Sequence, residues 1–591
     1  MKNYYGYLVK TAWKFATPYQ PRMLGYYLMF VFANLVSMSE PYVLALMLNT
    51  IQVGGDNLLI KVMGYLGLFV GIEFFFWVFH GNGRVLERIT AFHIIKNYYD
   101  RLFFILSKLP LKWHKNHHSG EIASRVKKAA EAIYQFSDDS YEFIETIVRF
   151  IVSLVAIFIL LPKFGVLALL MGVGIVIVIF RFDKLLVKDW REINERSHAA
   201  DSTFFDYITN IGTVITLRLE KLAQNVFTNK VLRIFPVLRR NIIINEIKWF
   251  AISLGLVLMN ALILFFYIYE QLSASKVILI GTLMALYQYS DRFVQVFFRL
   301  AWQYEKLVRL YTDVKTTEKI FSAYDEVSKV QDFSLSKTSL RGWGNIGINQ
   351  LSFRHDDETD GIHHLDKINL ELKRGVKIAL VGESGSGKST LMTLIRGLHD
   401  ADHVEVNIDG KIFPSLRVLA NSVTLIPQEP EIFENTIEYN VTAGIPHKKE
   451  DVGLVCDWAR FDSVVQKLPR GLKTNIKEKG VNLSGGEKQR LALARGLFAA
   501  RSAKSTILLL DEPTSSVDPK NEMMIYKAIF REFDQLCLVA SVHRLHLLGW
   551  FDLIYLFDQG KIVGQGSFYD LLSRNDLFKT MWEQYQREDH N

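Results

Sequence analysis

A glycine-rich segment that ends in lysine, serine and threonine is the first candidate for chemistry. The stretch "GESGSGKST" begins at residue 382, directly after the apolar run "KIALV". Four of its residues fit the pattern G-x-x-x-x-G-K-[ST], namely Gly382, Gly387, Lys388 and Ser389. In this pattern, backbone N–H groups surround phosphate, the lysine neutralises the outer phosphates and the hydroxyl reaches Mg²⁺. The segment therefore predicts a phosphate and magnesium site between a strand and a helix.

Further polar groups follow three apolar runs downstream. The run "ILLL" ends at Asp511 and Glu512, which would hold the magnesium shell and orient or deprotonate a water molecule. Gln428 follows "VTLIP", and His543 follows "CLVASV". A lone histidine is most often structural, but at a strand end that faces a triphosphate it would donate to the γ-phosphate.

The elements that must position these groups are buried strands. All four runs are continuously apolar without alternation, as in a parallel sheet that is covered on both faces. Ligands gather at the carboxyl ends of such strands. We therefore expect an α/β domain with a P-loop, in which these polar groups share one sheet edge.

The stretch "LSGGEKQR", from residue 483, is a second candidate for phosphate binding. Ser484, Gly485 and Gly486 precede the amphipathic, basic stretch "EKQRLALARGLF", which predicts a helix. Backbone N–H groups that are exposed at a glycine-rich helix start attract an anion. The pattern alone does not say which anion binds, or on which chain that anion is held.

The first half of the chain is predicted to cross a membrane. The 591 residues are 50% hydrophobic and 13% aromatic, which is too apolar for an ordinary soluble enzyme. Apolar windows near the length that a bilayer needs predict an all-α transmembrane domain of six helices. The windows, each of roughly 20 residues, lie at about 24–48, 58–80, 143–161, 164–182, 249–271 and 277–299.

The charge pattern orients these spans. Two long connections, each of about sixty residues, carry most of the basic residues of this half, so the positive-inside bias places them and both termini in the cytoplasm. The same topology accounts for the net charge of +8, and no basic tail predicts a nucleic-acid partner. We expect a transmembrane domain at 1–310, a linker at 311–335 and a cytoplasmic nucleotide-binding domain at 336–591.

The sixth predicted span carries a polar stripe. Gln288, Arg292, Gln295 and Arg299 follow one another at steps of four, three and four residues, which places them on one helical face. Polar groups inside a bilayer usually face a cavity or a partner, so the first three are candidates for a substrate path. Interhelical bonding, or snorkelling of Arg299, is the alternative. Glu73, in the second span, is a candidate partner for a basic group of the stripe.

Together these motifs resemble the nucleotide-binding domain of ABC transporters. "GESGSGKST", the glutamine of "LIPQEPEIF", "LSGGE", "LLLDEPTSSVD" and "SVHR" stand in the family's order behind six spans, as in half-transporters of the exporter type. The segments "LPLKWHKNHHSGEIASRV" and "FFDYITNIGTVITLRLEK" are similar to the family's cytoplasmic loops that carry coupling helices.

The resemblance implies a role for each matching residue. It implies that Glu512 is the general base, that His543 is the switch histidine and that Gln428 completes the shell of magnesium and water. Ser389 and Asp511 would join Gln428 at Mg²⁺. Asp518 would be the acid of the D-loop. The residues implied to bind ATP are His355, Gly382, Glu383, Ser384, Gly385, Ser386, Gly387, Lys388, Ser389, Thr390, Ser484, Gly485, Gly486 and Asp518.

The chain departs from the family pattern at three positions. His355 stands where the family usually stacks an aromatic residue on adenine, so we expect a weaker adenine contact or a looser choice of nucleotide. Glu487 replaces the commoner glutamine at the end of the signature, and Val517 replaces leucine in the D-loop. None of these changes removes a catalytic group.

The resemblance also implies a partner and a function. In this family the signature of one subunit caps the γ-phosphate of ATP that is held by the other subunit, so a chain with all motifs intact is expected to form a homodimer with two composite sites. The implied function is ATP-driven export across a cell membrane, expected to be a bacterial inner membrane, where the chain would also contact membrane lipid. The spans favour an amphipathic or lipid-linked cargo. The alternatives are half of a heterodimeric exporter, an importer, or an anchored ATPase that transmits force or signal without transport.

Overall fold

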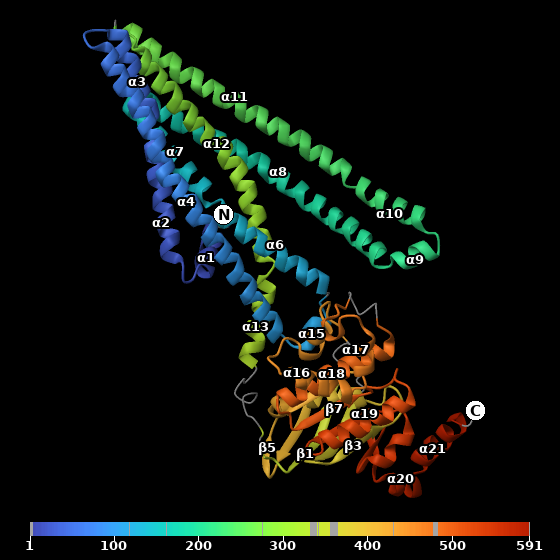
Figure 1. The fold of residues 1–591 in the computed structure, drawn as a ribbon. Helices are drawn as coiled ribbons and strands as arrows, with labels where there is room; N and C mark the ends of the chain where they lie inside the picture. Colours follow the sequence, from blue (N-terminus) through green and yellow to red (C-terminus); the bar gives the residue numbers. More distant parts are fainter. Residues whose placement is uncertain are drawn as a thin grey trace. The chain divides into compact units, whose positions relative to one another are not determined.

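The chain, described here from a computed structural model, consists of two compact units. The structure describes residues 4–117, 119–160, 162–274, 276–330, 340, 342–354, 364–429, 431–476 and 483–589. The first unit comprises Met1–Ser107 and Ser119–Ser322, and the second comprises Lys108–His118 and Ala323–Asn591. Among the described residues, strands occur only in the second unit (Figure 1).

Helices are the only regular secondary structure among the described residues of the first unit. Its last helix, α13, runs across the boundary between the two units. The helices are α1 (Tyr4–Phe15), α2 (Gln20–Ser37), α3 (Glu40–Val53), α4 (Leu58–Lys108), α6 (Ser119–Asp138), α7 (Ser140–Leu160), α8 (Pro162–Thr209), α9 (Ile211–Thr216), α10 (Glu220–Leu232), α11 (Phe235–Ser273), α12 (Ile280–Lys315) and α13 (Glu318–Val330).

The predicted spans lie on long helices that continue past the apolar windows. The second window, 58–80, continues without a break to the end of α4, so much of the long connection after it is helical. The helices α8 and α11 lie side by side and are similarly extended (Figure 1). Within the described residues, four helical stretches are long and apolar enough to cross a membrane, namely Gln20–Val53, Leu58–Lys108, Ser140–Leu160 and Glu220–Ser273. The remaining two predicted spans lie on α8 and on α12, which carries the polar stripe.

The first predicted span is interrupted where α2 meets α3. Pro41 lies in the first turn of α3, where the missing N–H of proline leaves no helical hydrogen bond unmade. Two side chains of α12 satisfy carbonyl groups near this break: Tyr289 Oη donates to the Met38 carbonyl over 3.0 Å, and Arg292 Nη1 donates to the Ser37 carbonyl over 3.1 Å. Within a bilayer such partners are needed because water does not supply them. The break therefore fixes the face of α12 that carries Arg292.

The strands of the second unit form two sheets among the described residues. The smaller sheet has the order β2-β1-β4-β5 and is antiparallel. The larger has the order β10-β9-β3-β8-β7-β6, in which only β10 runs antiparallel to its neighbour. The strands are β1 (Asn345–Phe353), β2 (Leu365–Lys373), β3 (Lys377–Val381), β4 (His403–Ile408), β5 (Lys411–Phe413), β6 (Val423–Ile426), β7 (Ile507–Asp511), β8 (Cys537–Ser541), β9 (Leu553–Asp558) and β10 (Lys561–Gly566).

The predicted α/β domain with a buried parallel sheet is confirmed. Every residue of β7 and β8 is buried, which is why these runs are apolar without alternation. The helix α18 packs on β6 and against α15 and α16. The helices are α14 (Lys388–Ile395), α15 (Ile437–Thr442), α16 (Lys449–Trp458), α17 (Asp462–Lys467), α18 (Gly485–Ser502), α19 (Pro519–Glu532), α20 (Phe568–Arg574) and α21 (Asp576–Asp589).

Short helices occupy the two segments that resemble coupling loops. One is α9, and the other is α5 (Leu111–Lys115). By its contacts α5 groups with the second unit, although its position in the chain lies among the membrane helices.

Candidate nucleotide site and membrane path

The larger sheet brings the sequence-predicted catalytic residues to one edge. The strand β7 lies between β6 and β8, and β8 is also paired with β3, all in parallel. Gln428, Glu512 and His543 follow β6, β7 and β8, and the glycine loop follows β3. Because parallel strands end at the same edge, the predicted common edge is confirmed.

The glycine loop, from Gly382 to Thr390, excludes side chains at two of its glycines. Gly382 has a φ of 153° and Gly387 a φ of 103°. A Cβ atom would lie 2.2 Å from the Phe557 carbonyl oxygen at Gly382 and 2.6 Å from Leu365 Cδ2 at Gly387. The loop therefore packs closely against β9 and β2 and leads directly into α14.

The lysine of this loop is buried within it. Lys388 is 5% exposed, and its Nζ donates to the carbonyl oxygens of Gly382 and Glu383, over 2.8 Å each, and to Ser386 Oγ over 3.2 Å. Burial lowers the pKa of Lys388, while the carboxylates of Glu512 and Asp511 oppose that shift. Those two carboxylates therefore help to keep the ammonium group charged.

Oxygen groups suited to magnesium lie beside the lysine. Ser389 Oγ donates to Asp511 Oδ1 over 3.0 Å. Burial raises the pKa of the Asp511 carboxyl, and the hydrogen bond from Ser389 opposes the shift. A hydroxyl and a carboxylate at the end of a P-loop fit the oxygen ligands that Mg²⁺ takes, with phosphate oxygens completing its shell.

Glu512 contacts both of its predicted neighbours. Gln428 Nε2 donates to Glu512 Oε2 over 2.7 Å, and His543 Nε2 pairs with Glu512 Oε1. The Glu512 side chain is 14% exposed, and its backbone has a φ of 46°. Strained backbone angles in non-glycine residues cluster at functional sites, and this one aims a carboxylate beyond the strand end.

The signature segment forms a capped helix start, as its sequence predicts. Ser484 is the N-cap of α18 and accepts from the Glu487 N–H, while Glu487 Oε2 accepts from the Ser484 N–H over 2.8 Å. This reciprocal arrangement is a capping box. Glu487, a departure from the family pattern, therefore has a structural role that its carboxylate performs. A Cβ on Gly486 would lie 2.7 Å from the Ser516 carbonyl oxygen, so α18 starts against the segment that follows Glu512.

The D-loop acid caps its own helix. Asp518 is the N-cap of α19, where Oδ1 accepts from the Asn521 N–H over 3.0 Å. The hydrogen bonds from Asn521 lower the pKa of Asp518. The structure therefore shows a capping role for this residue, and its contact with nucleotide stays a prediction. His355 lies outside the described residues, so its predicted stacking on adenine also stays a prediction.

A residue that the sequence did not predict joins the signature helix to the segment after Glu512. Gln489 is 7% exposed. Its Nε2 donates to Ser515 Oγ over 2.7 Å, and its Oε1 accepts from the Ser516 N–H over 2.7 Å. A glutamine on a basic helix carries no recognisable signal for this contact, since its partners lie 26 and 27 residues away.

In the membrane unit, the stripe of α12 forms ion pairs that only partly match the predictions. Arg292 Nη2 pairs with Glu40 Oε2 over 2.5 Å, between α12 and α3. The predicted pairing of Glu73 with a basic group of the stripe is wrong. Glu73 Oε1 instead accepts from Trp77 Nε1 over 2.8 Å within its own helix. Arg299 pairs with Glu145 of α7 over 2.9 Å, so interhelical bonding accounts for this residue. The residue Glu40 lies at the helix break, which the hydropathy pattern does not mark.

The other stripe residues differ in exposure. Gln295 is exposed, whereas Gln288 and Arg292 are half-buried. Phe293 and Phe297, on the opposite side of α12, are buried in the core of the membrane unit. Gln295 therefore faces away from the core of this unit, whereas Arg292 and Arg299 bond to neighbouring helices.

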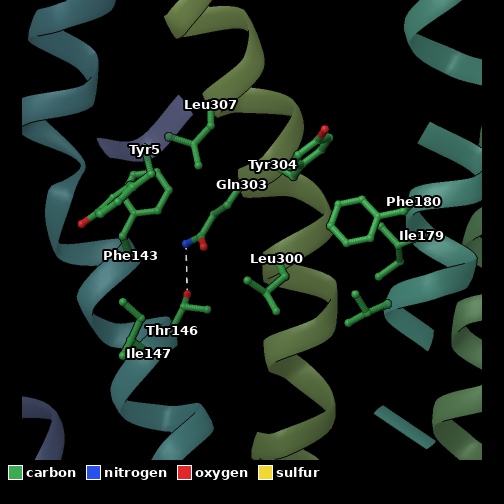
Figure 2. Close-up of a pocket in the computed structure, with 11 residues that line it drawn as sticks. Tyr5, Phe143, Thr146, Ile147, Ile179, Phe180, Leu300, Gln303, Tyr304 and Leu307 are labelled. Carbon is green, nitrogen blue, oxygen red and sulfur yellow. Dashed lines mark hydrogen bonds between the residues drawn. The ribbon is translucent and has the colours of Figure 1, made fainter. Parts of the chain in front are cut away.

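An apolar cavity lies beside the same helix. It has a volume of about 270 Å³, and Figure 2 shows Leu300, Tyr304 and Leu307 of α12 among the side chains that line it. The amide of Gln303 donates to Thr146 Oγ1 over 3.0 Å. The remaining lining comes from α1, α7 and α8 and consists of Tyr5, Phe143, Ile147, Val176, Ile179 and Phe180.

Two protein families match the chain. The family described as ABC transporter matches residues 365–515, and the ABC transporter transmembrane region matches residues 23–295. The first match covers the glycine loop and Glu512, and the second covers the helices of the membrane unit up to Gln295. The chain is accordingly a multi-pass membrane protein.

Curated relatives align with most of this chain. Heavy metal tolerance factor 1 from Caenorhabditis elegans is 26% identical over 82% of this chain and 59% of its own length. ATP-binding cassette sub-family B member 6 from Mus musculus is 25% identical over 82% of this chain and 57% of its own length. The chain thus spans less than two thirds of the length of these curated relatives.

A solved structure shares the fold. It is entitled "Structure of a bacterial Atm1-family ABC exporter with ATP bound" and superposes with a TM-score of 0.82, at 21% sequence identity. The superposition covers 96% of this chain and 98% of that chain. The fold is therefore that of a helical transmembrane domain followed by an α/β ATPase domain.

Proposed function

Because this chain belongs to the ABC transporter family, with a transmembrane domain joined to an ABC ATPase domain as in exporter half-transporters, we propose that it hydrolyses ATP to export a substrate across a membrane. The observation that carries the proposal is the contact of Glu512 with Gln428 and His543. These three residues lie at the sheet edge that also carries the glycine loop.

Glu512 is the proposed general base. Its carboxylate would accept the proton of the attacking water, while Gln428 orients that water and His543 donates to the γ-phosphate. Ser389, Asp511 and Gln428 would hold Mg²⁺, which neutralises charge on the phosphates. The loop from Gly382 to Thr390 would surround the phosphates with N–H groups. The ATPase domain is proposed to extend over 336–591, after a membrane domain at 1–310 and a linker at 311–335.

Two copies of the chain are proposed to form two composite sites. The glycine loop, Glu512, His543 and the signature are all intact in this chain, so neither site of a twofold dimer would be degenerate. The N–H groups of Ser484, Gly485 and Gly486 would face the γ-phosphate of ATP held by the partner, and Asp518 and His355 would complete the nucleotide contacts.

The proposed cargo is amphipathic or lipid-linked. The exposed Gln295 and the ion-paired Arg292 offer polar contacts on α12. The apolar cavity lies nearby on the same helix, at the cytosolic ends that we predict for the spans, and offers room for an apolar group. A bacterial inner membrane is the proposed location.

ATP hydrolysis by the full chain in lipid nanodiscs tests this proposal. We expect magnesium-dependent hydrolysis that an exported compound stimulates, with a panel of lipids, lipid-linked glycans, peptides and drugs as the probes. Movement of the stimulating compound into the lumen of inside-out vesicles would then establish export. Hydrolysis without movement of any compound would favour an anchored ATPase, and absence of hydrolysis in the homodimer would favour a heterodimer.

A further inference from the structure

A buried carboxylate links the two segments that carry Glu512 and His543. Glu522, in the first turn of α19, is 4% exposed. Its Oε1 accepts from Thr514 Oγ1 over 2.6 Å, and its Oε2 accepts from Arg544 Nη1 over 2.8 Å. Thr514 lies two residues after Glu512, and Arg544 directly follows His543. One side chain of a third element therefore contacts both segments.

The paired strands alone do not hold Glu512 and His543. The register between β7 and β8 ends at the pair Asp511 and Ser541, so both residues lie beyond the sheet ladder. Their side chains nevertheless touch each other. Something outside the sheet must therefore fix how the two segments leave it, and Glu522 contacts them on either side.

We propose that Glu522 is a positioning residue that holds the Glu512 and His543 pair in register for hydrolysis, an inference that rests on the proposed ATPase function. One carboxylate oxygen of Glu522 accepts from the segment that follows Glu512, and the other accepts from the segment that follows His543. Gln489 bonds to Ser515 and to the Ser516 N–H, so Glu522 and Gln489 together hold the three residues from Thr514 to Ser516.

A carboxylate suits this link better than a neutral amide. Two donors converge on Glu522, and the guanidinium of Arg544 has no acceptor capacity. Glutamine has one oxygen and one NH₂ group, so it satisfies Arg544 only by turning its NH₂ group to Thr514. Thr514 Oγ1 can accept from that NH₂ group, but its own hydroxyl proton then loses its buried acceptor, and the Arg544 guanidinium loses its charged partner, so the two segments are held less firmly. Glu522→Gln therefore changes the geometry while keeping the size of the side chain.

A matched control exists in the same unit. Asp400 accepts from Arg417 Nε over 2.6 Å and from Nη2 over 2.5 Å, so Asp400→Asn makes the same chemical change at another carboxylate–arginine pair. The Asp400 side chain is 63% exposed, and among the described residues its hydrogen bonds go to Arg417, which is not one of the residues assigned to the site. We expect hydrolysis to be unchanged in this variant.

The experiment measures ATP hydrolysis and ATP binding by the full chain in nanodiscs. Glu522→Gln should lower kcat by about 10- to 100-fold, as expected for a misplaced catalytic group. The KM for ATP should stay within about twofold, because the glycine loop is untouched. Thr514→Val, which removes one hydroxyl, supplies the same test if Glu522→Gln does not fold. An unchanged kcat in a folded variant would overturn the inference.

A second background separates positioning from general stability. If Glu522 acts through the Glu512 and His543 pair, Glu522→Gln should cause little further loss of single-turnover rate in a chain that already carries His543→Ala. An equal fold-loss in both backgrounds would show a structural role only and overturn the inference. Absence of hydrolysis in the wild-type chain would instead refute the proposed ATPase activity of the homodimer. Normal wild-type hydrolysis together with normal hydrolysis in Glu522→Gln would refute this inference alone.

Discussion

Glu512 combines a strained backbone with two side-chain contacts. Its φ of 46° is strained for any residue other than glycine. In this conformation the side chain contacts Gln428 and His543. Two side-chain contacts hold the carboxylate in one position, as expected if Glu512 is the proposed general base. Such strain is typical of functional sites, and it does not itself stabilise the fold.

Replacing Glu512 with glutamine tests this role. The Glu512→Gln variant keeps the shape of the side chain but cannot take a proton, so hydrolysis should fall by about 10² to 10⁴. ATP binding should persist, because Lys388 and the glycine loop are unchanged. The measurement is hydrolysis beside equilibrium binding of labelled ATP. Near-normal turnover, or loss of binding, would contradict the assignment.

At the scale of single elements, the start of α18 explains a departure from the family pattern. Glu487 closes a capping box with Ser484, a contact that glutamine can also make. The charge of Glu487 is therefore dispensable, whereas its length and acceptor group are not. Because the helix start also carries Gly485 and Gly486, its order determines where the exposed N–H groups point.

Two substitutions at Glu487 separate these properties. Glu487→Gln should hydrolyse ATP at a rate within about twofold of wild type, since the capping bond survives. Glu487→Ala should lower the stability of the ATPase unit by about 1 kcal/mol and lower the hydrolysis rate as the helix start frays. Thermal unfolding and hydrolysis assays measure both effects. Equal behaviour of the two variants would count against the capping role.

The face of α12 gives a prediction about the membrane path. Cysteines at Gln288, Arg292 and Gln295 should react with a polar thiol reagent in the nucleotide-free state and be protected after ATP binds. Phe293 and Phe297 are 0% and 2% exposed, so cysteines there should not react and serve as the matched controls. Uniform inertness of all five positions would indicate a buried helix contact in place of a path.

The sequence predicted elements and edges better than it predicted partners. Buried parallel strands and the groups at their ends were readable because each short apolar run ends directly at a polar residue suited to the same phosphate chemistry. The partner of Arg292 was not readable, since Glu40 lies at a helix break that hydropathy does not mark. The contacts of Glu522 could not be predicted from the sequence, because only the folded chain brings Thr514 and Arg544 to it.

At the scale of the whole molecule, the proposed composite sites require two chains. The signature lies at the start of α18, and its N–H groups have no phosphate to serve unless a partner supplies one in the proposed dimer. Twofold symmetry would then build two equivalent sites, each from the glycine loop of one chain and the signature of the other. The location of each defect in a mixed dimer therefore decides how many sites survive.

Trapping of ATP in two kinds of mixed dimer tests this requirement most directly. In the first dimer, one chain carries Ser484→Arg and the other carries Lys388→Ala. In the second, one chain carries both substitutions and the other carries neither. Glu512→Gln in every chain would keep bound ATP from being hydrolysed. If the sites are shared between chains, the first dimer should trap one ATP and the second none. Trapping by the second dimer and not by the first would show that each chain closes its own site and would contradict the account.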